Sequence, residues 1–212
     1  MTGATLSLGS RALRERYAAG LSSPVDVVDE VYERIAARGD DHVWISLVPH
    51  DVARATAAAL DPADVTRLPL YGLPFAVKDN IDVAGLETTV ACPAYAYTAA
   101  RDAVVVERLR AAGAVLIGKA NLDQFATGLN GTRSPYGVPG SAPDPRLIAG
   151  GSSSGSGVAV GAGLVSPAAY RSRSDRDPSE RAASVMLRRA PPPCRRAAPR
   201  RKRWRRTPLP AW

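Results

Sequence analysis

The sequence predicts an α/β fold, in which helices cover a parallel or mixed sheet. A helical segment over 102–112 ends at Gly113, and the apolar strand AVLIGK follows at once over 114–119. Two further apolar segments, VWISLV at 43–48 and FAV at 75–77, have the length of short buried strands. Helices that lead through tight glycine turns into apolar strands are typical of sheets with both faces covered.

The first well-marked helix is expected to begin at Pro24. Ser23 suits the N-cap position, because its hydroxyl can accept a hydrogen bond from a free amide of the first turn, and proline suits the first helical position. Gly39 is expected to end this helix. An apolar face is formed by residues with helical spacing, namely Val27, Val28, Val31 and Ile35.

Four other segments are expected to be helical. The segment 51–60 reads DVARATAAAL, and Asp102 is expected to cap the helix over 102–112. Another helix is expected to start within 121–129. The segment 157–165 holds only Gly, Val, Ala and Leu, so a helix there has no polar face and must pack closely against its neighbours.

The distribution of charge divides the chain after Ser166. Residues 167–212 contain 14 Lys and Arg and 3 Asp and Glu, a net charge of +11, whereas 1–166 carries a net charge of −3. The same 46 residues hold 8 of the 18 prolines and show no helical or strand periodicity. We therefore expect one folded unit over 1–166 and a basic Arg/Pro-rich tail over 167–212 that is disordered.

Bulk properties favour a cytoplasmic globular protein. With 212 residues the chain can form one domain with a substantial core. No apolar run approaches the ~18 residues of a membrane span, and the N-terminus lacks the apolar core of a signal peptide. Two cysteines, Cys92 and Cys194, do not suggest a disulfide framework, so a reducing compartment is expected.

Lys78 is the first residue with chemical promise, because it directly follows the apolar segment 75–77. A lysine at the end of a buried strand loses hydration, which lowers its pKa and favours the neutral base. The alternative is a lysine whose stem is buried while its amine reaches solvent.

The Gly/Ser-rich segment GGSSSGSG at 150–157 is the second such feature. Its backbone amides could surround an anion, although it has neither the Gly-Lys-Ser/Thr of a phosphate-binding loop nor the spacing of a dinucleotide-binding loop. A Gly/Ser run can also be a flexible turn.

Three stretches in order resemble the amidase signature family: GLPFAVKDNIDVAG at 72–85, GKANLDQFATGLNGTRSPYG at 118–137 and AGGSSSGSGVAVGAGLVS at 149–166. Their details resemble the allophanate hydrolase branch. The resemblance implies the amidase-signature fold, a mixed twisted sheet covered by helices, of which only the N-terminal part is present. It also implies hydrolysis of amide C–N bonds by a Ser–cis-Ser–Lys triad.

Carried over position by position, the resemblance makes Lys78 the base and Ser152 the serine that follows a cis peptide bond. Ser153, Thr127 and Gly128 would line the substrate pocket beside them. The base is plausible chemically, since a serine hydroxyl needs an adjacent base to act on an amide. No metal and no organic cofactor are implied.

The family's nucleophile lies in a Gly-Thr-Asp-x-x-Gly-Ser stretch, and this stretch is missing. Arg176 stands at the position that corresponds to the nucleophilic serine. The chain as written is therefore expected to be an inactive fragment, and its abrupt change after Ser166 leads us to hypothesise a shift of the reading frame there. Loss of the remaining sheet is expected to weaken the fold.

Other interpretations remain open. A general amidase or a glutamyl-tRNA amidotransferase subunit is the nearest alternative enzyme. The basic segment RRAAPRRKRWRR at 195–206 could instead make the chain a polyanion-binding protein. A third interpretation is a pseudoenzyme that keeps the N-terminal half as a scaffold. The expected partner is a small-molecule amide substrate, with no membrane, no nucleic acid, and a possible homodimer in the full-length parent.

Overall fold

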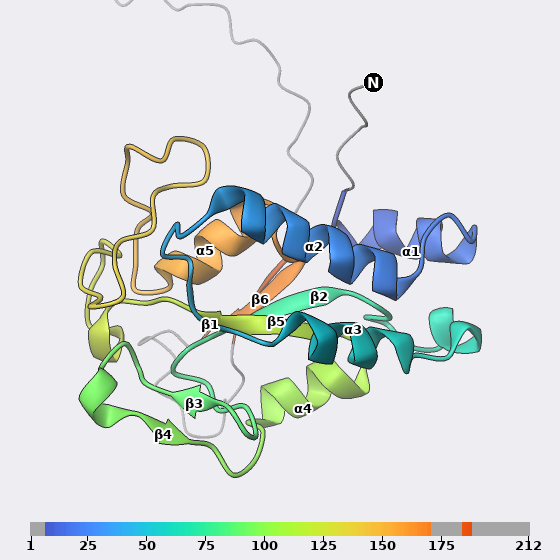
Figure 1. Ribbon diagram of the computed structural model, residues 1–212, viewed down its shortest axis with the longest axis horizontal. Coiled ribbons are helices and arrows are strands. Elements are labelled where there is room, and N and C mark those ends of the chain that lie inside the picture. The colour runs from blue at the N-terminus through green and yellow to red at the C-terminus, as the bar shows by residue number, and fades with distance from the viewer. Residues whose placement is uncertain (1–6, 171–183, 188–212) are drawn as a thin grey trace, which may run out of the picture.

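The computed structural model describes residues 7–170 and 184–187, and Figure 1 shows their arrangement. A mixed five-stranded sheet lies at the centre, with the strand order β1-β5-β2-β6-β7. Its strands are β1 (Trp44–Leu47), β2 (Pro74–Lys78), β5 (Val115–Ala120), β6 (Pro167–Tyr170) and β7 (Ser184–Leu187). β2 runs parallel to both β5 and β6, whereas the outer strands β1 and β7 are antiparallel to their neighbours.

Helices cover both faces of this sheet, as the sequence predicted. On one face, α1 (Ser10–Ala18), α2 (Pro24–Arg38) and α5 (Ser154–Gly161) share a core with side chains of β2 and β5. On the other face, α3 (His50–Ala58) and α4 (Val104–Ala111) pack against alternate residues of the same strands. A two-stranded hairpin, β3 (Glu87–Thr88) and β4 (Tyr97–Thr98), lies beyond the sheet on the α4 side (Figure 1).

Short 3₁₀ turns complete the described elements, at Pro62–Val65, Pro93–Tyr95 and Gln124–Ala126. Within the part of the chain that the structure describes, no helix is both long and apolar enough to cross a bilayer.

The local rules for α2 are confirmed in detail. The Ser23 hydroxyl accepts a hydrogen bond from the Asp26 N–H at 3.2 Å, and the Asp26 carboxylate accepts one from the Ser23 N–H at 2.8 Å. This reciprocal pair is a capping box, which satisfies two amides that the helix cannot pair internally. Four apolar residues of the predicted face are buried: Val27, Val28, Val31 and Ile35.

Two predictions about helix starts are wrong. Asp102 does not cap α4, because its carboxylate accepts from the Ala84 N–H at 2.7 Å and pairs with Arg110 at 2.7 Å instead. The helix expected within 121–129 is only a short 3₁₀ turn, in which Phe125 has a φ of +51°. Asn and Asp side chains there bind backbone groups, and such bonds compete with helical ones.

The predicted boundary after Ser166 also needs correction. Residues Pro167–Tyr170 form β6, which pairs with β2 through Ala168 and Ala169, and both alanines are fully buried. Ser184–Leu187 form β7 beside it. Small apolar residues therefore continue the sheet past the predicted boundary. The rest of the basic tail lies outside the described residues.

Candidate active site

Lys78 is the last residue of β2, and its side chain is completely buried. Its Nζ donates hydrogen bonds to Ser152 Oγ at 2.8 Å and to Ser153 Oγ at 3.0 Å. The alternative of an amine that reaches solvent is therefore wrong. The structure brings together the three residues that the sequence selected from segments 74 and 75 positions apart.

Burial lowers the pKa of Lys78 to about 8, as expected for an amine that has lost its hydration. The negative charge of Asp123 acts in the opposite direction and limits this decrease. Because the pKa lies close to neutrality, a useful fraction of the Lys78 side chains is neutral near pH 7–8 and can accept a proton.

The Gly/Ser segment is held in place and is not a free turn. The peptide bond between Gly151 and Ser152 is cis, at the position that the resemblance indicated. The Gly151 N–H donates to the Leu129 carbonyl at 2.8 Å, and the Ser152 carbonyl accepts from the Asp123 N–H at 3.0 Å. A Cβ on Gly151 would lie 2.2 Å from Asp123 Oδ2, so this close approach requires glycine.

Asp123 organises the loop beside the lysine and was not identified from the sequence. It is fully buried, and its two carboxylate oxygens accept from the Gly131 N–H at 3.0 Å and the Arg133 N–H at 2.8 Å. The signal that could have revealed it is its place just after β5, because polar residues at the carboxyl ends of parallel strands often form a site.

The two pocket residues expected near this loop differ in their surroundings. Gly128 is buried against Asp123, since a Cβ there would lie 2.1 Å from Asp123 Oδ2. The side chain of Thr127 is exposed, and its hydroxyl donates to the Gln124 carbonyl at 2.9 Å. The structure thus places Gly128 next to the lysine–serine group through Asp123, while Thr127 binds only its own loop.

A second buried lysine lies on the opposite face of the sheet. Lys119 pairs in register with Val77, whereas Lys78 pairs with Ala120, so the two lysines point in opposite directions. Lys119 Nζ lies 3.5 Å from Asp79 Oδ1 and donates to Thr88 Oγ1 at 2.9 Å. Both charged side chains are fully buried, and they fix β3 against the end of the sheet.

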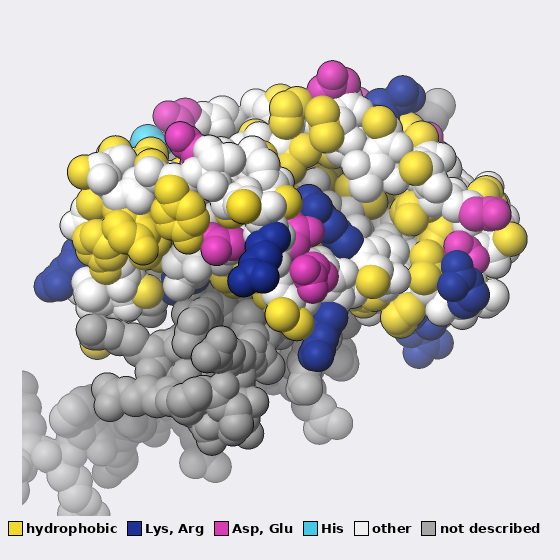
Figure 2. Space-filling view, turned by 90° about the horizontal axis from the view of Figure 1, so that it is seen from below, with side chains coloured by type: hydrophobic (Ala, Val, Ile, Leu, Met, Phe, Trp, Pro, Cys, Tyr) yellow, Lys and Arg dark blue, Asp and Glu magenta, His cyan; other side chains and the backbone are white. Residues whose placement is uncertain are grey.

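An exposed aromatic cluster borders the same loop. Tyr95 packs edge-to-face against Tyr97 and Phe125, with ring centroids 5.8 and 5.7 Å apart. Between 42% and 50% of each residue is exposed. Figure 2 views the molecule from the side of the β3–β4 hairpin and shows hydrophobic side chains gathered on this surface. The sequence analysis did not single out this cluster.

The geometry supports transfer of a proton from a serine hydroxyl to a neutral amine in a dry site. Lys78 reaches Ser152 directly, and Ser152 is half-buried, so its hydroxyl remains open to a reacting group. Position 176, where the nucleophile was expected, lies outside the described residues. In residues 7–170 and 184–187, no group of three or more His, Cys, Asp or Glu side chains could hold a metal ion.

Comparisons with known proteins agree with this site. The Amidase family model matches residues 26–170. The chain therefore belongs to the amidase family, and its fold is the amidase-signature fold.

Among curated relatives, the urea amidolyase of Saccharomyces cerevisiae is 52% identical over 126 residues, which cover 59% of this chain and 7% of that protein. A glutamyl-tRNA(Gln) amidotransferase polypeptide of Symbiobacterium thermophilum is 42% identical over 161 residues, which cover 74% of this chain and 33% of that protein. The chain thus spans a third or less of the length of these two relatives.

Among solved structures, the selenomethionine form of Kluyveromyces lactis allophanate hydrolase matches with a TM-score of 0.67 and 41% identity, over 78% of this chain and 28% of that chain. The peptide amidase of Stenotrophomonas maltophilia matches with a TM-score of 0.68 and 33% identity, over 76% of this chain and 35% of that chain.

Proposed function

We propose that residues 7–170 carry the base and the proton relay of an amide-hydrolysing site. The observation that supports this proposal most directly is the contact between Lys78 Nζ and Ser152 Oγ at 2.8 Å in a buried setting. A lysine with a pKa of about 8 is poised to exchange protons near neutral pH.

In the proposed reaction, a nucleophilic serine attacks the amide carbonyl. Its proton passes to Ser152 Oγ, and the Ser152 proton passes to Lys78 Nζ. When the C–N bond breaks, the amine leaving group takes a proton back along the same path. Water then hydrolyses the acyl–serine intermediate, which returns the serine hydroxyl.

For the substrate, we propose allophanate, which would yield ammonia and carbon dioxide. The 52% identity to a urea amidolyase and the likeness to an allophanate hydrolase support this choice. The 42% identity to an amidotransferase polypeptide keeps a general amidase or an amidotransferase as the second candidate. A polyanion-binding role of the tail would rest on residues outside the described part.

We further propose that the chain as written is inactive, because Arg176 occupies the position that the resemblance assigns to the nucleophile. An arginine side chain has no hydroxyl that could form an acyl intermediate. A pseudoenzyme would have the same property, whereas a shift of the reading frame would not reflect the natural protein.

The first test is to resequence the coding DNA across codons 155–185 and beyond. We expect one inserted or deleted base to restore a Gly-Thr-Asp-x-x-Gly-Ser stretch with its serine at position 176. If no frame encodes this stretch, the hypothesis of a frame shift is wrong, and a pseudoenzyme becomes the better interpretation.

The second test is ammonia release from allophanate and from glutamine, by the chain as written and by a frame-corrected protein. Only the corrected protein should act, with preference for allophanate. Lys78→Met and Ser152→Ala should each reduce its kcat by roughly 10²–10⁴-fold, while Ser156→Ala, a buried serine that does not contact Lys78, should not. Hydrolysis by the chain as written would contradict the proposed nucleophile.

A further inference from the structure

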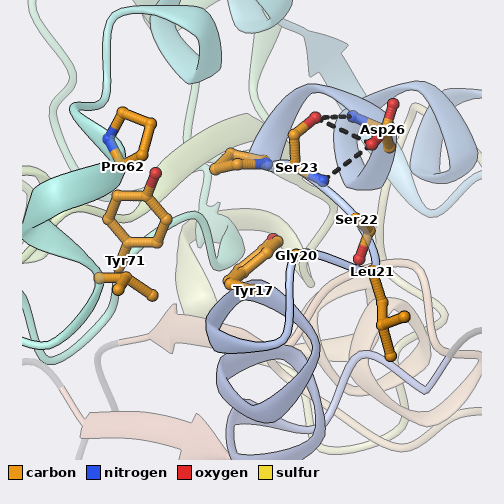
Figure 3. Close-up of a pocket in the computed structure, with 10 residues that line it drawn as sticks. Tyr17, Gly20, Leu21, Ser22, Ser23, Asp26, Pro62 and Tyr71 are labelled. Carbon is orange, nitrogen blue, oxygen red and sulfur yellow. Dashed lines mark hydrogen bonds between the residues drawn. The ribbon is translucent and has the colours of Figure 1, made fainter.

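A separate cavity of about 350 Å³ lies at the other end of β2. Tyr71, one of its lining residues, precedes β2, whereas Lys78 is the last residue of that strand. The strand rises about 3.3 Å per residue, so the cavity and the Lys78 amine lie at opposite edges of the sheet. Figure 3 shows Tyr71 and Pro62 across this cavity from Tyr17 and Ser23.

The walls of this cavity are fixed by the ends of helices. The Leu21 N–H donates to the Arg16 carbonyl at 3.0 Å at the end of α1, and the Ser23–Asp26 capping box fixes the start of α2. Tyr17 is held by its hydroxyl, which donates to the Gly72 carbonyl at 2.9 Å. A pocket whose walls are already fixed loses little conformational freedom when a ligand enters.

Most of the lining is apolar or aromatic. The rings of Tyr17 and Tyr71 pack edge-to-face with centroids 5.6 Å apart. Leu21, Pro62 and Val65 add aliphatic surface, and 67% of Leu21 is exposed. This surface suits the hydrocarbon part of a small molecule, and the volume is within the ordinary range for ligand pockets.

Two polar atoms in the lining lack a partner among the described residues. Asp26 uses only Oδ2 in the capping box, so Oδ1 accepts no hydrogen bond there. The Tyr71 hydroxyl has no hydrogen bond within the described part of the chain, although only 7% of the residue is exposed. A bound donor could therefore satisfy both atoms.

The charges around the cavity favour a cation. Among the described residues, Asp26 is the only charged one in the lining. Burial raises the pKa of Tyr71, and the negative charges of Asp61 and Asp64 raise it further. Asp64 is paired with Arg67, and Arg16 donates to the Ser22 hydroxyl at 3.2 Å, so Asp26 and Asp61 dominate the field. Tyrosine rings also attract cations through their faces.

We propose that this cavity binds a small organic cation, a protonated amine attached to an aromatic or aliphatic body. The ammonium group would donate to Asp26 Oδ1, and the hydrocarbon part would contact Tyr17, Tyr71 and Leu21. The site is independent of the proposed amidase chemistry, because it shares no residue with the lysine–serine group.

The test is a calorimetric or NMR titration of this chain with 2-phenylethylamine, which is protonated at pH 7, and with the neutral analogue 2-phenylethanol. We expect saturable binding of the amine, at least tenfold tighter than that of the alcohol. Asp26→Asn keeps an acceptor for the capping box but removes the charge, and it should weaken amine binding about tenfold or more, since hydrogen bonds to charged groups are the stronger ones.

Matched controls make this result specific. Asp40→Asn removes an exposed charge beyond the far end of α2, with 87% of its side chain exposed, and it should leave the affinity unchanged. Ser152→Ala should also leave it unchanged; if it abolishes binding, the amine occupies the amidase site and the proposal is wrong. Equal affinity for amine and alcohol, no effect of Asp26→Asn, or no saturable binding would each overturn it.

Discussion

Asp123 holds Ser152 through the backbone, because its N–H donates to the Ser152 carbonyl at 3.0 Å while its carboxylate receives two other amides. One residue thus fixes the serine beside Lys78 and also the turn that follows β5. The negative charge of Asp123 also keeps the pKa of Lys78 from falling further. Several of the consequences below depend on this relationship.

Asp123→Asn should destabilise the fold by about 1–3 kcal/mol, because an amide group can accept from only one of the Gly131 and Arg133 N–H groups. The same change should lower the pKa of Lys78, since the opposing charge is lost. Urea unfolding measures the first effect, and NMR titration of the Lys78 Nζ resonance measures the second. An unchanged Lys78 pKa would contradict the electrostatic role of Asp123.

Stability should rise with pH between about 8 and 10.5 because of Lys78. In this range the unfolded chain keeps its lysine protonated, while the folded chain does not, so unfolding takes up a proton and becomes less favourable as pH rises. Lys78→Met should reduce this rise when urea midpoints are compared at pH 7.5 and 10.5. Burial also lowers the pKa of Lys119, which acts in the same direction, so some slope should remain.

Gly151→Ala should destabilise the fold by several kcal/mol, because the new Cβ would lie 2.2 Å from Asp123 Oδ2 and 2.5 Å from the Gly131 nitrogen. Gly157→Ala in α5 is the matched control, since nothing lies within 4 Å of its Cβ position. Alanine in a helix is favoured over glycine by about 1 kcal/mol, so the control should be neutral or stabilising in thermal unfolding. Equal effects of the two changes would show that the contact with Asp123 is unimportant.

Lys119→Met should cost about 3–5 kcal/mol, because it leaves the buried Asp79 carboxylate without its cation. The double variant Lys119→Met/Asp79→Asn should cost less than the sum of the single changes, and a double-mutant cycle in urea measures the difference. Strict additivity would mean that the 3.5 Å approach of these two side chains contributes nothing.

The sequence was sufficient for the layered α/β fold and for the lysine–serine contact. Lys78 and Ser152 lie in stretches whose letters resemble the family, and apolar segments marked β1, β2 and β5 within one residue or two. Asp123 and the Asp79–Lys119 pair were missed because their roles depend on neighbours far along the chain. No local pattern shows which carboxylate will meet which amide.

The wrong helix within 121–129 has a similar origin. Asn121 Nδ2 donates to the His42 and Gly137 carbonyls at 2.8 and 3.1 Å, and its Oδ1 accepts from the Ser134 hydroxyl at 2.6 Å. These partners satisfy the turn without helical hydrogen bonds. The strand at Pro167–Tyr170 was missed because the strongly basic composition that follows it dominated the interpretation.

The 74 residues that separate Lys78 from Ser152 have a consequence for the order in which the protein forms. Contacts between distant positions require long loops to close first, and they slow folding in comparison with local contacts. On the ribosome, the lysine emerges well before the serine, while β6, the neighbour of β2 on one side, follows later still. The amine therefore loses its water late in synthesis, after the first helices can already have formed.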